Sequence, residues 1–157
     1  MKKHILFVAG IIAGIGFQTT QPATPTKEVL LVGFTTQLTK LKLEVADLKK
    51  KMPRGSNFAI KPIKAAFEAQ IKARESKIAR LEFFVAILKA PTPKLTAKLK
   101  YQIKILEAQI EKAEQDRAKI KGPHFVTKPI KAAHTAVIKA KKAEIAPYKK
   151  VEKALGL

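Results

Sequence analysis

Apolar residues recur every three or four positions in four long stretches of this chain, and proline and glycine separate the stretches. This spacing is the period of an α-helix, in which such residues share one face. The breaks fall at Pro53 with Gly55, at Pro91 with Pro93, and at Gly122 with Pro123. No segment alternates with period two for long enough to indicate a strand. The pattern therefore predicts an all-α fold of four helices.

Each predicted helix carries a narrow apolar seam that must be covered by another helix. The first seam is the most regular, with steps of three and four at Leu31, Phe34, Leu38, Leu41, Val45, Leu48 and Met52. The second seam consists of Ile60, Ile63, Phe67, Ile71, Ile78, Leu81, Val85 and Leu88. The third consists of Leu95, Leu99, Ile103, Leu106, Ile110, Ala113 and Ile120, and the fourth of Ile130, His134, Val137, Ile138, Ile145 and Tyr148. Because the connections are only a few residues long, consecutive helices must run antiparallel. We expect one helical hairpin over residues 27–90 and a second over residues 92–157, which together form an elongated four-helix or coiled-coil-like bundle.

The two hairpins resemble each other in sequence. Residues 58–79 and 125–146 are identical at 13 of 22 positions when offset by 67, including the run KPIKAA in both. A shared run of six residues with proline in the same place exceeds what similar composition explains. The first helices match less well at this offset, with Glu44 opposite Glu111 and Gly55 opposite Gly122. We infer an internal duplication of one helical hairpin.

Local signals predict where the helices begin and bend. Thr24 with Pro25, and Thr92 with Pro93, are typical of an N-cap followed by a first-turn proline. The fourth helix is expected to begin near Pro129. Pro147 should then kink it or split it into two pieces, because proline removes a backbone hydrogen bond.

The N-terminus has the pattern of an export signal. Lys2 and Lys3 precede an almost wholly apolar run over residues 5–17, which is too short to cross a bilayer, since that takes about 20 helical residues. We predict a signal peptide over residues 1–16 and a spacer over residues 17–26. The protein is then exported, periplasmic or extracellular. The alternatives are an uncleaved segment that anchors the protein in a membrane, or a buried N-terminal helix.

Positive charge dominates the chain. It has 32 Lys and Arg against 12 Asp and Glu, a formal net charge of +20, and removal of residues 1–16 would leave +18. A small domain needs a net charge of only about 2–8 to stay soluble. Thr135 and Lys142 stand where the first copy has Glu68 and Glu75, so one face of the fourth helix becomes a basic strip. We predict that this strip binds a polyanion through Lys128, Lys131, Lys139, Lys142, Lys149 and Lys153.

These features predict an exported, non-catalytic basic protein that binds an acidic surface or polymer. An envelope polymer, an anionic lipid membrane and a nucleic-acid backbone are the partners considered. Sequence-specific nucleic-acid binding is not expected, because no base-reading motif occurs. The alternative is an exported coiled-coil scaffold or holdase-like protein that binds another protein or itself.

Catalytic and metal-binding patterns are weak. The chain has no cysteine and none of the familiar nucleophile, zinc or phosphate-loop motifs. His134 takes the seam position of Phe67, which indicates a core histidine. Glu107, Glu111 and Glu114 share a helix face with Asp116 nearby, but basic residues at helical spacing favour ion pairs: Lys104, Lys112 and Arg117. We expect no enzyme, no cofactor, no metal and no small-molecule substrate.

Overall fold

A computed structural model describes residues 25–55 and 57–157. They form four helices, α1 (Lys27–Lys51), α2 (Lys61–Lys89), α3 (Pro93–Lys119) and α4 (His124–Ala154), with no strand in this part of the chain. The all-α prediction is confirmed. The predicted signal peptide and almost all of the spacer lie outside the described residues. None of the described helices is long and apolar enough to span a membrane.

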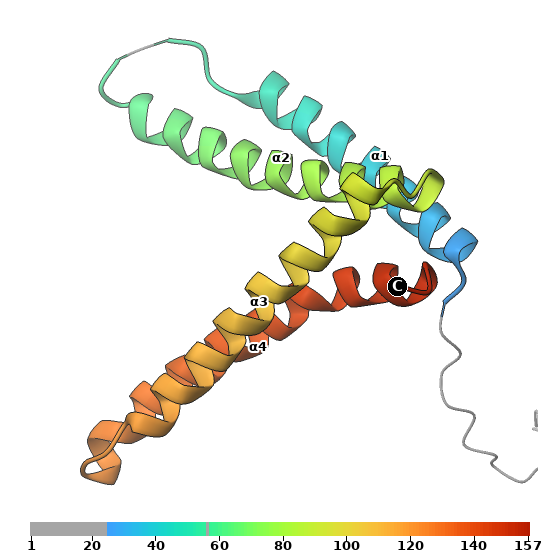
Figure 1. The fold of residues 1–157 in the computed structure, drawn as a ribbon. Helices are drawn as coiled ribbons and strands as arrows, with labels where there is room; N and C mark the ends of the chain where they lie inside the picture. Colours follow the sequence, from blue (N-terminus) through green and yellow to red (C-terminus); the bar gives the residue numbers. More distant parts are fainter. Residues whose placement is uncertain (1–24, 56) are drawn as a thin grey trace, which may run out of the picture.

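The helices pair as two antiparallel hairpins, as predicted. α1 packs on α2 and α3 packs on α4. The hairpins diverge in a V, with the α2–α3 connection and the C-terminus at the apex and the other two connections at the free ends (Figure 1). The four helices therefore share a core only at the apex, and each arm of the V consists of two helices. This differs from a four-helix bundle that extends along the whole length.

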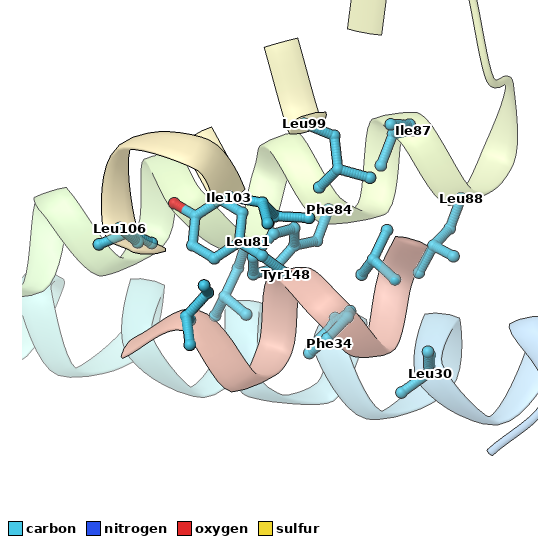
Figure 2. Close-up of a cluster of buried hydrophobic side chains, with 12 residues drawn as sticks. Leu30, Phe34, Leu81, Phe84, Ile87, Leu88, Leu99, Ile103, Leu106 and Tyr148 are labelled. Carbon is cyan, nitrogen blue, oxygen red and sulfur yellow. The ribbon is translucent and has the colours of Figure 1, made fainter. Parts of the chain in front are cut away.

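The common core at the apex contains twelve buried apolar side chains from all four helices (Figure 2). Phe84 of α2 is 1% exposed and lies at its centre. Its ring centroid is 5.1 Å from that of Phe34 on α1 and 4.7 Å from that of Tyr148 on α4, the latter edge-on. Leu99 of α3 is fully buried in the same cluster. Aromatic contacts of this kind join the two hairpins to each other.

An ion pair also crosses between the hairpins at the apex. Arg80 Nη2 on α2 lies 3.0 Å from Glu144 Oε1 on α4, and the Arg80 guanidinium stands 5.9 Å from the centre of the Tyr148 ring. Burial raises the pKa of Tyr148 above its usual value, and the charge of Arg80 partly opposes this.

The starts of α1 and α3 follow local capping chemistry, with one correction to the prediction. Thr92 accepts a hydrogen bond from the Leu95 amide at 3.3 Å, as the Thr92–Pro93 pair predicts. The first helix is capped by Thr26 rather than by Thr24, through a bond of 3.4 Å from the Val29 amide.

α4 begins at His124 rather than near Pro129, so Pro129 and Pro147 both lie inside it. The helix continues through both prolines without a break to Ala154, and its C-terminal half bends towards the apex (Figure 1). A bend without a split is one of the two outcomes expected of Pro147.

The predicted seams are buried where a partner helix faces them. All seven members of the first seam are buried or half-buried. Ile63, Ile130 and Val137 are exposed instead. Ile63 lies beyond the point where α1 ends, and Val137 neighbours the buried Ile138 on a helix with a single partner. Phe84 and Ile87, which the seam pattern omitted, are buried because α2 is covered on more than one side at the apex.

Candidate functional site

The predicted basic strip runs along α4, but two of its lysines are paired with acids. Lys142 Nζ lies 2.8 Å from Glu114 Oε1, and Lys149 Nζ lies 2.7 Å from Glu107 Oε1, both acids being on α3. The other strip lysines form no ion pair within the described residues: Lys128, Lys131, Lys139 and Lys153. The strip is therefore only partly free to hold an external anion.

A groove between α3 and α4, near the free end of the second hairpin, brings part of the strip together with a residue from α3. We call it the second groove; it is lined by Glu114, Arg117, Ala118, Lys131, Thr135, Ile138, Lys139 and Lys142. The charge of Glu114 is matched by Lys142. Three exposed cations remain without an ion pair in the described chain: Arg117, Lys131 and Lys139. Lys128 and Lys153 do not line the groove, and Lys149 lies further along the same side.

Arg117 is the groove residue that sequence reasoning missed as a binding residue. Its position on the same helix as Glu114 indicated a partner for the acidic residues of that helix. In the structure those acids are held mainly by α4, through Lys142 and Lys149, and Arg117 is left facing the groove. Glu107, Glu114 and Asp116 do form ion pairs, but none of their partners is one of the predicted residues Lys104, Lys112 and Arg117, and Glu111 forms no ion pair within the described residues. Only the register of α3 against α4 reveals this.

The first hairpin has an equivalent groove with a different charge. This first groove is lined by Lys49, Met52, Glu68, Ile71, Lys72 and Glu75. Each of these positions has a counterpart in the second groove: residues of α2 match α4 at an offset of 67, and residues of α1 match α3 at an offset of 65. Two lysines and two glutamates leave the first groove without net charge.

The ion pairs of the two arms occupy the same positions with the charges exchanged. In the first hairpin the lysines are on α1, with Lys49 Nζ 2.9 Å from Glu75 and Lys42 Nζ 2.8 Å from Glu82. In the second hairpin the counterparts of Glu75 and Glu82 are Lys142 and Lys149, and the acids are on α3. The helix register is thus the same in both arms although the sign of each partner is reversed.

This register corrects the alignment of the first helices. The sequence comparison placed Glu44 opposite Glu111 at an offset of 67, whereas the packed helices correspond at 65. Gly55 and Gly122 do correspond at 67, and both have positive φ, of 120° and 132°. A turn with this backbone conformation favours glycine, because a side chain would be strained there. The offset between the two hairpins therefore changes from 65 to 67 between the end of the first helix of each hairpin and the glycine of the following turn.

The structure gives little support for the remaining candidates for catalysis or metal binding, which are His134 and the acidic residues of α3. His134 is half-buried rather than a core residue, and it lies in a separate depression of the second hairpin beside Val137. Glu111 accepts a hydrogen bond of 3.2 Å from Gln115. Within the part of the chain that the structure describes, no three His, Asp or Glu side chains are placed to hold a metal ion.

Comparison with known proteins gave no match: no family model, no curated protein and no solved structure is significantly similar to this chain. The functional argument therefore rests on the residues and geometry of the chain itself.

Proposed function

We propose that this is an exported, non-catalytic helical protein that binds an acidic polymer in the second groove. The observation that carries the proposal is the convergence of Arg117, Lys131 and Lys139 from two helices on one groove, where none of the three pairs with a carboxylate of the described residues. Like charges held this close repel one another, and a polyanion relieves the repulsion while releasing its own counterions.

The shape of the site favours a flexible strand over a rigid surface. The groove is open and lies along the side of the arm, where it follows the direction of the helices. Charges spaced along such a groove match repeated anionic groups on an extended chain, such as an envelope polymer, a glycan or a nucleic-acid backbone. Binding through lysine and arginine alone is strongly dependent on salt and does not read a sequence. The proposed export rests on residues 1–16 of the sequence.

The equivalent lysines of the two hairpins provide a matched test. One variant changes Lys128, Lys131 and Lys139 to Gln, and the control changes their counterparts Lys61, Lys64 and Lys72 to Gln. All six lysines are exposed, and each of the two variants loses the same total charge. We expect the first variant to elute from a heparin column at clearly lower salt than the control. Equal elution of the two variants would show that only bulk charge matters, and would overturn the proposal.

Salt separates this proposal from the alternative of a scaffold or holdase-like protein. At about 0.5 M salt the Debye length is about 4 Å, so the attraction between exposed charges that lie further apart is largely screened, and polymer binding through lysine and arginine should be strongly weakened. A defined complex with another protein that survives this salt would favour the scaffold.

A further inference from the structure

The free ends of the two hairpins expose large apolar side chains at equivalent positions. Phe58 is 93% exposed and Phe125 is 80% exposed, and the two residues correspond at the offset of 67. Ile63 and Ile130 also correspond and are about half exposed, at 52% and 44%. Scattered apolar residues are normal on a protein surface. A phenylalanine left in solvent at the same place on both arms, each with an isoleucine near it, is a patterned feature.

Both ends are also purely basic. No acidic residue occurs in residues 48–67 or 117–136. Residues 48–55 and 57–67 belong to the end of the first hairpin, and residues 117–136 belong to the end of the second. The cations of the first end are Lys49, Lys50, Lys51, Arg54, Lys61 and Lys64. Those of the second are Arg117, Lys119, Lys121, Lys128 and Lys131. Lys49, Lys51 and Lys119 pair with acids that lie just outside these ranges, and the other cations of the ends form no ion pair within the described residues. Each end thus combines exposed apolar side chains with a net positive charge.

The V shape directs both ends to the same side of the molecule. The α1–α2 and α3–α4 connections lie at the open side of the V, away from the apex (Figure 1). A single broad surface placed across the open side would therefore meet both ends together. The second groove lies along the side of one arm and shares Arg117 and Lys131 with the end of that arm, whereas Phe58 and Phe125 lie outside the groove.

We propose that the two hairpin ends form a bivalent contact with the surface of an anionic lipid bilayer. Phe58 and Phe125 insert among the headgroups and upper acyl chains, and the surrounding lysines and arginines lie against the anionic headgroups. Apolar side chains flanked by Lys and Arg are typical of segments that bind at a membrane interface. This inference does not rest on polymer binding in the second groove.

A bilayer suits these ends better than a folded protein partner does. Each end protrudes, so a rigid partner would need two matching pockets at the correct separation. A bilayer is laterally continuous and yields to a protruding side chain wherever the end touches it. Once one end is inserted, the other is held near the surface, so the second contact forms at high effective concentration.

Tryptophan fluorescence tests the insertion directly, because the chain contains no tryptophan. The full-length variants Phe58→Trp and Phe125→Trp each place a single probe at one end. With vesicles of phosphatidylcholine and phosphatidylserine, we expect the emission of both to shift to the blue and to be quenched by brominated lipid. Tyr101→Trp is the control, since Tyr101 is 63% exposed on α3 but lies outside both ends. Its emission should not change.

Three results would overturn the inference. One is a blue shift and quenching of both end probes on addition of anionic vesicles that are no larger than those of the Tyr101→Trp control. Another is equal insertion into vesicles of phosphatidylcholine alone, which would show that anionic lipid is not required. The third is a blue shift without lipid that grows with protein concentration, which would show that the ends contact a second copy of the chain.

The double variant Phe58→Ala with Phe125→Ala separates this inference from the proposed function. We expect it to bind the anionic vesicles at least about tenfold more weakly, since the two aromatic side chains that insert into the bilayer are lost. Its elution from heparin should be unchanged, because no charge is altered. Vesicle binding equal to that of the unaltered chain, with unshifted end probes, would overturn the membrane contact and leave the groove proposal standing. Insertion of the end probes together with equal heparin elution of the two lysine variants would overturn the groove proposal and leave the membrane contact standing.

Discussion

The two arms solve the same packing problem with opposite charges. Both hold a lysine–glutamate pair at equivalent positions between their helices, but the acid is on α2 in the first arm and on α3 in the second. Exposed pairs of this kind contribute only about 0.2–1 kcal/mol each. Exchanging their signs therefore costs the arm little stability. The comparison teaches that the same helix register is compatible with the lysine on either of the two paired helices.

The difference in net charge comes from other positions in the grooves. Thr135 takes the place of Glu68, and Arg117 takes the place of Met52. The first change removes an acid and the second adds a cation. With the pairs balanced in both arms, these two positions account for two of the three positive charges by which the second groove exceeds the first. The third is Lys131, whose counterpart Lys64 does not line the first groove.

The largest expected effect concerns the apex, which holds the two arms in one molecule. Phe84→Ala should lower the free energy of unfolding by about 3–5 kcal/mol, because it removes a fully buried aromatic ring and leaves a cavity. Urea unfolding followed by circular dichroism measures this loss. Phe58→Ala, at a free end, is the control and should stay within about 0.5 kcal/mol of the unaltered chain. Similar losses for the two variants would contradict a core confined to the apex.

A transplant of the second groove onto the first arm should produce an intermediate effect. The variant combines Lys49→Glu, Met52→Arg, Glu68→Thr and Glu75→Lys. It adds two positive charges around a restored ion pair, so we expect affinity for heparin at low salt to rise on the order of tenfold. Binding of heparin measured by calorimetry over a range of salt checks the gain.

The control for the transplant carries only Lys49→Glu and Glu75→Lys, which reverses the pair without altering net charge. Its heparin affinity and stability should match those of the unaltered chain. A gain in the control as large as that of the transplant would show that the direction of the pair, rather than groove charge, controls binding.

The smallest expected effect is the energy of the exchanged pairs. Double-mutant cycles with alanine at Lys49 and Glu75, and at Lys142 and Glu114, should give coupling energies of about 0.2–1 kcal/mol, similar in the two arms. High salt should reduce both. Thermal or urea unfolding of the four single and two double variants measures them. A coupling confined to one arm would break the equivalence of the two registers.

The sequence predicted most of the architecture correctly because the relevant signals are local. The helical period, the prolines and glycines between the segments, and the Thr92 cap act within a few residues of each other. Short connections then require antiparallel hairpins. Pro129 predicts a start of α4 that is five residues too late, because a helix with a packed partner tolerates an internal proline and begins at His124.

The candidate site was predicted only on the α4 side. Comparison of the two sequence copies shows that acids of the first copy are replaced on one face of the fourth helix, and this predicted Lys131 and Lys139, which do line the groove. The register of α3 against α4 decides that acids of α3 neutralise Lys142 and Lys149. The same register places Arg117 in the groove. A shift of two residues between the hairpins misled the alignment of the first helices. A pattern along one helix carries no information on that register.

By itself the sequence determined the helices, their pairing into hairpins and the excess of positive charge, because each follows from spacing and composition along the chain. The tertiary structure alone decided that the hairpins meet only at the apex, that Phe84 lies at the centre of their common core, and that three cations face one groove with no ion pair to any residue that the structure describes. These features depend on contacts between residues far apart in the chain. Such contacts are selected by which packing buries the most apolar surface, and no local period encodes that choice.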